Sequence, residues 1–454
     1  MNAKEVIAAF AMAAVSALAA ELPPATCDVV VVGGGSAGIC AAVASGRAGA
    51  KTVLVESAAQ VGGNTTTGGV NFPGLFHAWG RQVIAGVGWE LVTNTVGLAG
   101  GTLPDFSQPT GASHWKQQVT VNIPLFVALA EEMLLKAGVT IQYHAAPMRI
   151  EKTTEGWRMV TAAAGDTRTI LCKQLVDCTG NGAVAGLLGL ERLQEKERQP
   201  GSFAYTLRPN TDLKKLDAKA LQAHFDEAVK AGAVQHSDCR WGVMQYLIGG
   251  GNVGNYVEGA DNSNADARTD TNLRGRASML RMYRWLKTVP GLEKIELVSM
   301  SPEVGVRETY RVTGESLIAY EDYVSGKRWD DSVCYAFYPV DMHSQKTGVQ
   351  PAHLKEGVVP TVPLRALIPK GSKNLLVAGR CLSSDRLANS GLRVQATCMA
   401  TGQAAGAAAA LAARLGVTPG SAPLAELKAM LRAGGAIVPE GRSHGPGAAE
   451  SGTR

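Results

Sequence analysis

Three glycines spaced as G-x-G-x-x-G are the residues whose types and spacing most directly indicate chemistry. Gly33, Gly35 and Gly38 follow the apolar run 28–32, which has the β-branched composition of a strand buried on both faces. The first glycine allows a tight turn, the second lets a pyrophosphate approach the backbone, and the third lets a helix pack against the strand. Glu56 ends the next apolar run, where a carboxylate would accept hydrogen bonds from ribose hydroxyls. The pattern predicts a site for an adenine dinucleotide, either NAD or FAD.

The segment after the glycine turn has the composition of a helix over residues 36–48. Ser36 would begin this helix, so that backbone N–H groups and the positive end of the helix dipole face the phosphates. An ordinary strand–turn–helix unit without a ligand is the alternative interpretation, because glycine-rich turns also arise by chance. The valine-rich strand, the alanine-rich helix and the acid at a suitable distance together favour the dinucleotide.

Three later stretches distinguish the two dinucleotides by resemblance. They are residues 61–69 (VGGNTTTGG), 175–189 (LVDCTGNGAVAGLLG) and 374–412, which begins NLLVAGRCLSSDRLANSGLR. The first resembles the second glycine pair of flavoproteins with two dinucleotide-binding domains. The second resembles the strand and turn over the adenine side of FAD in those proteins. The third resembles the closing segment of the FAD-dependent oxidoreductase family. That family includes heterodisulfide reductase-like flavoproteins and lies near the fumarate reductase-like flavoproteins. Besides Gly33, Gly35, Ser36, Gly38 and Glu56, the residues that the resemblance assigns to FAD are Gly62, Gly63, Asn64, Thr179, Gly180, Gly379, Arg380, Gly391 and Arg393.

The resemblance implies an enzyme that transfers hydride between a small organic substrate and non-covalently bound FAD. Dehydrogenation of a hydroxyl or of a C–C bond is favoured, and reduction of an unsaturated acid is the alternative. A flavoprotein that relays electrons to a partner protein is a second class of function. The chain departs from the family pattern at Asn181, where an aspartate is commoner, and it has no clustered cysteines for an iron–sulfur cluster. We therefore consider an external electron acceptor as a partner.

The expected fold is α/β, with a Rossmann-like FAD-binding domain of the glutathione-reductase type and an inserted α+β substrate or cap domain. The FAD-binding domain is discontinuous in sequence and comprises residues 27–199 and 359–415. Residues 200–350 form the inserted domain, and residues 416–454 form a C-terminal helix and a flexible tail.

Histidine is the first candidate for proton transfer because its pKa lies near neutrality. His343 follows Asp341 by two residues, so both side chains lie on the same side of an extended segment. The alternative is a structural histidine held by the aspartate. Arg307 could bind a substrate carboxylate, and the resemblance to fumarate reductase-like flavoproteins implies that it could instead donate a proton. An ion-pair network of Arg307 with Glu308 and Arg311 is the alternative for that stretch.

Two further residues are candidates for contact with the flavin. His77 follows the second glycine pair, although a histidine on a surface loop is an equal alternative. Cys381 is the thiol expected nearest to the flavin, but a redox role is disfavoured without a partner cysteine at disulfide spacing. The eight cysteines contain no C-x-x-C motif, so the sequence indicates no metal site.

Bulk composition excludes several classes of partner. The formal net charge is +5, from 44 Lys and Arg against 39 Asp and Glu, and it is not gathered into basic runs. We therefore expect a small-molecule substrate and no nucleic acid. Composition does not indicate the oligomeric state.

The N-terminal residues 1–20 contain an apolar run and an A-x-A cleavage pattern at Ala17-Leu18-Ala19. The run predicts a signal peptide, and with it a periplasmic or secreted protein. It is shorter than the roughly 20 residues that span a bilayer, so no integral membrane span is expected. An alanine-rich N-terminal helix in a cytoplasmic protein is the alternative.

Overall fold

Strand β1 (Ala25–Val32) lies at the centre of the main sheet. Its consecutive valines 29–32 are buried because protein layers cover both faces of the sheet. Val30 pairs in parallel with Val53 on one neighbouring strand and with Leu175 on the other. The predicted strand–turn–helix–strand unit is therefore present.

The computed structural model describes residues 24–108, 113–163, 165–251, 255–344 and 348–440. The predicted signal peptide at residues 1–20 lies outside the described residues, as does the final part of the predicted tail. No helix in these ranges is long and apolar enough to cross a membrane.

The main sheet combines parallel and antiparallel strands. In spatial order they are β5 (Thr140–Gln142), β2 (Thr52–Val55), β1, β8 (Asp166–Asp177), β7 (Trp157–Ala163) and β6 (Ala146–Lys152), with β19 (Leu375–Val377) also paired to β8. Strands β5, β2, β1, β8 and β19 run parallel, whereas β6 and β7 join β8 as an antiparallel meander. This is the α/β fold class predicted from the sequence.

Short two-stranded pairings and helices complete the described structure. The short strands are β3 (His77–Ala78), β4 (Arg81–Gln82), β9 (Arg192–Leu193), β10 (Gly201–Ser202), β11 (Tyr205–Arg208), β12 (Tyr256–Val257), β13 (Glu296–Met300), β14 (Arg311–Val312), β15 (Ser332–Tyr335), β16 (Val340–Ser344), β17 (Gly348–Ala352) and β18 (Thr361–Pro363). The helices are α2 (Ser36–Arg47), α3 (Val87–Leu98), α4 (Ile123–Lys136), α5 (Ala183–Leu187), α6 (Ala218–Lys230), α7 (Val243–Ile248), α8 (Ala265–Leu286), α9 (Tyr320–Val324), α10 (Arg386–Leu392), α11 (Gln395–Leu415) and α12 (Leu424–Ala433).

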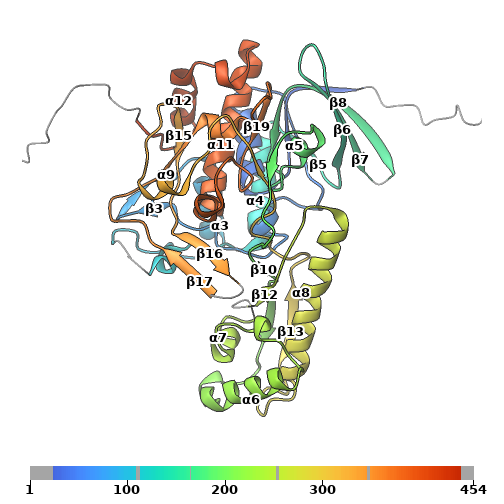
Figure 1. The fold of residues 1–454 in the computed structure, drawn as a ribbon, viewed down its shortest axis with the longest axis vertical. Coiled ribbons are helices and arrows are strands. Elements are labelled where there is room, and N and C mark those ends of the chain that lie inside the picture. Colours follow the sequence, from blue (N-terminus) through green and yellow to red (C-terminus); the bar gives the residue numbers. More distant parts are fainter. Residues whose placement is uncertain (1–23, 109–112, 164, 252–254, 345–347, 441–454) are drawn as a thin grey trace, which may run out of the picture.

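Helices α2 and α11 pack with their backbones in close contact. A Cβ atom added at Gly402 would overlap the carbonyl oxygen of Ala37, and one added at Gly406 would overlap that of Ala41. The small residues of α11 permit this approach, and nearly the whole helix is buried. The contact joins the start of the chain to residues near its end, beside the main sheet (Figure 1).

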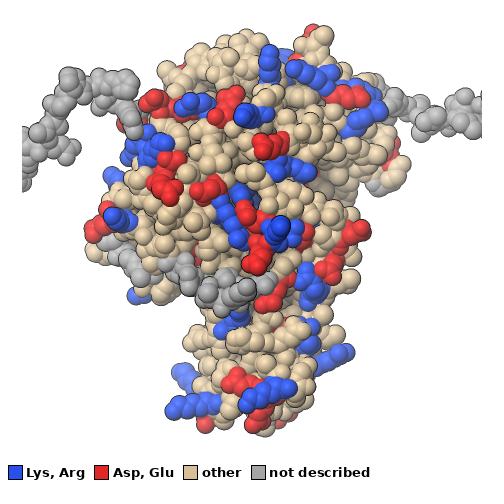
Figure 2. Space-filling model, viewed as in Figure 1, with Lys and Arg blue, Asp and Glu red and all other residues tan. Residues whose placement is uncertain are grey.

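A second apolar core forms a separate lobe, which extends downward in Figure 1. This core includes buried residues between Phe203 and Val306 from α6, α7, α8, β11 and β12. The predicted inserted domain extends further, to residue 350, but Ile318, Val333 and Val340 pack in the core of the α/β part. In the face drawn in Figure 2, acidic and basic side chains are interspersed over both parts.

The α2–α11 contact predicts a large effect of one added methyl group. Gly406→Ala should lower the free energy of unfolding by about 3 kcal/mol, because the new Cβ overpacks the backbone of α2. Gly97→Ala is the matched control, since Gly97 is exposed on α3 and its Cβ would meet open space. That change should be neutral or stabilise by up to ~1 kcal/mol. Urea unfolding of both variants measures the difference, and equal stabilities would contradict the proposed contact.

Candidate functional site

A cavity of about 340 Å³ opens at the carboxyl ends of β1, β2 and β8. Its wall includes residues from the segments 32–37, 55–58 and 63–68 in the first part of the chain and from 178–183 later on. The last stretch contributes Gly379, Arg380, Arg393, Gln395 and Cys398. Ligands of open α/β sheets bind at this edge of the sheet. The main sheet therefore positions a ligand site where the glycine motif predicted one.

The glycine turn leaves its ligand side open. Gly33 has a φ of +95°, and a Cβ there would lie 2.7 Å from the carbonyl oxygen of Cys178, so a side chain is excluded on the sheet side. A Cβ at Gly35 would meet no atom within 4 Å. Gly35 and Ser36 line the cavity at the N-terminus of α2, whose free N–H groups suit a phosphate.

Glu56 lines the cavity at the end of β2. One carboxylate oxygen accepts a hydrogen bond of 2.5 Å from the backbone N–H of Gly34, and the other accepts one of 2.7 Å from that of Ala58. These bonds fix the carboxylate beside the glycine turn. Its remaining acceptor positions suit ribose hydroxyls.

Most residues that the sequence assigned to the cofactor lie on the cavity wall. Those on the wall are Gly33, Gly35, Ser36, Glu56, Gly63, Asn64, Thr179, Gly180, Gly379, Arg380 and Arg393. Gly38, Gly62 and Gly391 do not line it. Gly38 packs beneath Gly33, and a Cβ at Gly391 would meet the ring of Tyr323.

Three residues of the cavity wall each carry one buried side-chain polar atom that has no hydrogen-bond partner within the described structure. These atoms are Thr67 Oγ1, Asn181 Oδ1 and Arg393 Nε. Unpaired buried polar groups are costly, so these atoms need a ligand or water. A donor on Arg393 and polar atoms on Thr67 and Asn181 suit the many acceptors and the hydroxyl groups of FAD. The residues present therefore fit this cofactor.

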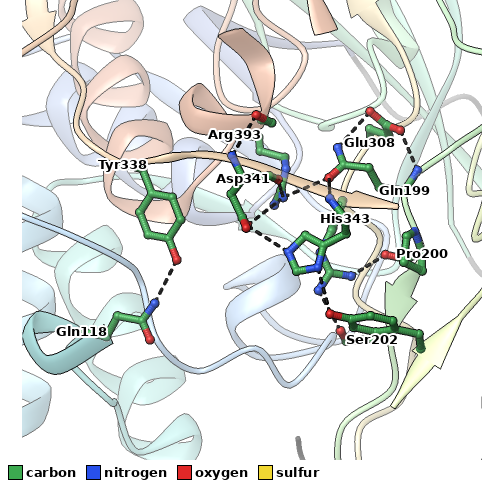
Figure 3. Close-up of polar contacts among 12 residues, drawn as sticks. Gln118, Gln199, Pro200, Ser202, Glu308, Tyr338, Asp341, His343 and Arg393 are labelled. Carbon is green, nitrogen blue, oxygen red and sulfur yellow. Dashed lines mark hydrogen bonds and ion pairs between the residues drawn. The ribbon is translucent and has the colours of Figure 1, made fainter. Parts of the chain in front are cut away.

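His343 and Asp341 form the predicted pair on β16 (Figure 3). His343 Nε2 lies 2.9 Å from Asp341 Oδ2, and Nδ1 lies 2.9 Å from the hydroxyl of Tyr256. Burial lowers the pKa of His343 to about 4, although Asp341 acts in the opposite direction. The imidazole is therefore neutral near neutral pH.

The tautomer of His343 follows from the ionisation of Asp341. Burial favours protonation of Asp341, but the hydrogen bond from His343 and the charge of Arg393 lower its pKa below the usual value. An ionised carboxylate only accepts hydrogen bonds, so Nε2 of His343 carries the proton. Nδ1 is then the acceptor for the Tyr256 hydroxyl.

Arg393 connects this pair to the cavity. Its Nη2 donates to the backbone oxygen of Asp341 at 3.0 Å, to Asp341 Oδ2 at 3.3 Å and to Gln199 Oε1 at 3.3 Å. Gln199 Oε1 also accepts from the backbone N–H of His343 at 3.1 Å. Arg393 also lines the cavity, so the residue that binds Asp341 and Gln199 (Figure 3) borders the candidate cofactor site as well.

The three charged residues of the RETYR stretch, 307–311, have different partners. Arg307 donates to the carbonyl oxygen of Pro200 and, at 3.1 Å, to Ser202 Oγ, and it lies 5.4 Å from the centre of the Tyr256 ring. Glu308 and Arg311 instead make separate ion pairs, with Arg386 at 2.8 Å and Glu195 at 2.6 Å respectively. Burial and the charge of Arg393 lower the pKa of Arg307 to about 10. It therefore remains a cation near neutral pH.

Two other residues that were expected near the flavin do not line the cavity. His77 stacks on Phe106 with ring centroids 3.8 Å apart and does not line the cavity. Cys381, the thiol expected nearest to the flavin, does not line the cavity either. Cys381 is fully buried beneath the wall, whereas Cys178 and Cys398 line it. Cys398 belongs to the first turn of α11, which faces the cavity.

Sequence reasoning missed several polar residues of this site. They are Thr67, Gln199, Tyr256, Arg268 and Gln395. Gln395 carried a usable signal, because it begins the alanine-rich helix after Arg393. Tyr256 and Arg268 come from the lobe, and no local motif marks them.

The buried histidine predicts a specific dependence of stability on pH. The pKa of His343 is lower in the folded chain than the ordinary 6.5, so the unfolded chain binds more protons below that pH. The lowered pKa of His343 contributes about 3 kcal/mol to the free energy of unfolding above pH 6.5, and this contribution is lost as the pH falls to about 4. His343→Gln should flatten the free energy of unfolding in this window. The exposed His236→Gln is the control, and the same slope in both variants would refute the prediction.

Comparisons with known proteins agree with this site. The chain matches the family described as FAD dependent oxidoreductase over residues 28–431. A search of curated proteins gave no match. The narrower resemblances to heterodisulfide reductase-like and fumarate reductase-like proteins stay predictions.

Solved flavoproteins are among the similar structures. The anhydrotetracycline hydroxylase OxyS from Streptomyces rimosus has 18% identity and a TM-score of 0.29, with 41% of this chain and 38% of that chain covered. A geranylgeranyl bacteriochlorophyll reductase-like protein from Thermoplasma acidophilum has 10% identity and a TM-score of 0.41, with 90% and 83% covered. The flavin-dependent monooxygenase PieE, in complex with FAD and substrate, has 16% identity and a TM-score of 0.28, with 40% and 36% covered. The chain thus spans about two fifths of the length of the hydroxylase.

The family match extends over most of the chain and includes the glycine turn, Glu56, the 175–189 turn and the first turn of α11. This chain belongs to the FAD-dependent oxidoreductase family, and it is an oxidoreductase with FAD as its cofactor.

Proposed function

We propose that the enzyme exchanges hydride between FAD and a small organic substrate, with dehydrogenation of a hydroxyl or of a C–C bond as the favoured reaction. The observation that carries this proposal is the buried Tyr256–His343–Asp341 chain, which Arg393 joins to the FAD cavity. FAD, when bound, accepts or returns the hydride. The protein must then bind the substrate and move the accompanying proton.

Tyr256 is the residue of this chain best suited to meet a substrate proton. Its hydroxyl donates to Nδ1 of His343, so its oxygen keeps a lone pair for a substrate O–H or an acidic C–H. A proton received there would move the Tyr256 proton to His343, and Asp341 would stabilise the resulting imidazolium. Burial raises the pKa of Tyr256, which keeps the phenol protonated before reaction.

Reduction of an unsaturated acid is the second candidate, and Arg307 favours it. Within the described ranges its guanidinium makes no ion pair: it donates to the neutral oxygens of Pro200 and Ser202 and lies over the ring of Tyr256. A substrate carboxylate would supply the missing negative charge. The external electron acceptor considered from the sequence remains part of this proposal for either reaction.

An absorbance experiment tests the proposed reaction. The FAD-loaded enzyme is mixed anaerobically with pools of secondary alcohols, saturated acids and other candidate reductants, and loss of the oxidised flavin band identifies a substrate. Tyr256→Phe should keep the flavin band but slow its loss by roughly 100-fold, because the proton path is interrupted. Tyr283→Phe, near the C-terminal end of α8, is the control.

The outcomes separate the two candidates. Bleaching by an alcohol or a saturated compound supports dehydrogenation. Enzyme that resists every reductant pool but, after chemical reduction, is reoxidised by an unsaturated acid supports the Arg307 reaction. A Tyr256→Phe rate equal to that of the control would exclude the proposed proton path.

Retention of FAD tests the role proposed for Glu56. Glu56→Ala should weaken FAD binding roughly tenfold or more, because it removes a charged acceptor on the cavity wall and two hydrogen bonds to the glycine turn. Flavin fluorescence during titration of the apoprotein measures the affinity. Glu155→Ala, in an exposed loop, should leave it unchanged. Equal affinities of the two variants would contradict this role.

A further inference from the structure

The lobe supplies part of the FAD cavity wall. Asn262, Arg268, Glu303 and Val304 all line the cavity, although they belong to the lobe or to the loops that join it. Arg268 lies in the first turns of α8, the long helix of the lobe (Figure 1). A bound cofactor would therefore contact both parts of the molecule.

Arg268 is held in place by one acid and keeps donors available. Its Nε donates to Glu303 Oε2 at 3.2 Å, and its Nη2 donates to the other carboxylate oxygen. Among the described residues, its Nη1 group makes no hydrogen bond. The side chain remains 42% exposed, so the guanidinium is not enclosed by protein. Glu303 thus occupies one edge of the guanidinium and leaves another edge for a ligand.

The lobe residues that line the cavity lie next to the turn at residues 178–181, which packs on Gly33. Gly33 packs against the backbone of Cys178, two residues before Gly180. Asn181 follows at once, and its Nδ2 donates to the backbone oxygen of Asn262 at 3.2 Å. The backbone N–H of Glu303 donates to Thr67, which also lines the cavity. The lobe therefore meets the cavity at the 178–181 turn, which packs on Gly33 of the glycine motif, and at Thr67.

Three arginines line the cavity, together with the acids Glu56 and Glu303. The arginines are Arg268, Arg380 and Arg393. Arg380 is buried and donates to the carbonyl oxygens of Gly180 and Val306. Burial lowers the pKa of Arg380, and the charges of Arg393 and Arg268 lower it further. The two phosphates are the anionic groups of oxidised FAD, so they are the groups of the cofactor that these arginines would bind.

We propose that Arg268 binds the diphosphate of FAD and so attaches the lobe to the cofactor. Glu303 orients the guanidinium, and Nη1 donates to a phosphate oxygen. This proposal rests on the FAD assignment and is independent of the substrate and of the proton path. It adds a cofactor-binding residue from outside the glycine motifs.

Affinity measurements on apoprotein variants test the proposal. Arg268→Ala should weaken FAD binding roughly tenfold or more, as expected for loss of a charge-assisted hydrogen bond. Glu303→Gln keeps a hydrogen-bonding side chain and removes negative charge from the wall, so its affinity should stay within about twofold of the parent or rise. Arg276→Ala is the matched control on α8, because Arg276 is only half-buried and, among the described residues, its side chain donates a hydrogen bond only to the carbonyl oxygen of Pro302.

A purely structural ion pair would give a different pattern. If the pair only fixes the lobe, Arg268→Ala and Glu303→Gln should weaken FAD binding equally, and that result would overturn the proposal. Unchanged affinity of Arg268→Ala would overturn it as well. Arg268→Gln provides a second variant if the alanine variant does not fold, and thermal unfolding of each apoprotein checks its stability.

Hydrogen exchange tests the attachment of the lobe directly. Adding FAD should slow exchange of the backbone amides at residues 265–270 in the parent protein, because the cofactor restrains the first turns of α8. In Arg268→Ala at saturating FAD this slowing should be smaller, whereas Arg276→Ala should behave as the parent. No slowing in the parent protein would exclude attachment through α8.

Discussion

The contact between α2 and α11 is the constraint on which the site depends. The glycines of α11 let its backbone touch that of α2, and this contact brings the start of α11 to the glycine turn. Gly35 at the start of α2 and Gln395 at the start of α11 consequently line one cavity, although the whole middle of the chain separates them. A larger side chain between the helices would move these two walls apart. The alanine-rich composition of α11 is thus a requirement of the cofactor site as much as of the core.

Buried charge imposes the next constraint. Asp341 is removed from water, and its ionised form is stable there because His343 and Arg393 both bind its carboxylate. The same contacts orient the imidazole and hold Arg393, which also lines the cavity. Arg393 therefore couples the electrostatics of the two sides, because a change in the charge of the cofactor would act on the guanidinium that holds Asp341.

Local motifs were readable in the sequence, and long-range partners were not. The glycine turn and Glu56 could be predicted because they belong to one strand–turn–helix–strand unit whose spacing the backbone imposes. The pairing of His343 with Asp341 follows from the alternation of side chains along a strand. Tyr256 and Arg268 reach the site through the packing of the lobe, which no short pattern records. Cys381 does not line the cavity, because adjacency in sequence to Arg380 does not determine which side chain faces it.

One short segment of the lobe serves both halves of the site. Tyr256 on β12 contacts His343. Arg268, shortly after it in the sequence on α8, lines the FAD cavity. Asn262 lies between them and accepts a hydrogen bond from Asn181 of the α/β part. A rigid shift of the lobe would therefore displace the Tyr256 hydroxyl and the Arg268 guanidinium together. Because the proposed proton path needs Tyr256 within hydrogen-bond distance of His343, a cofactor that restrains Arg268 would also help to hold that path in its working geometry.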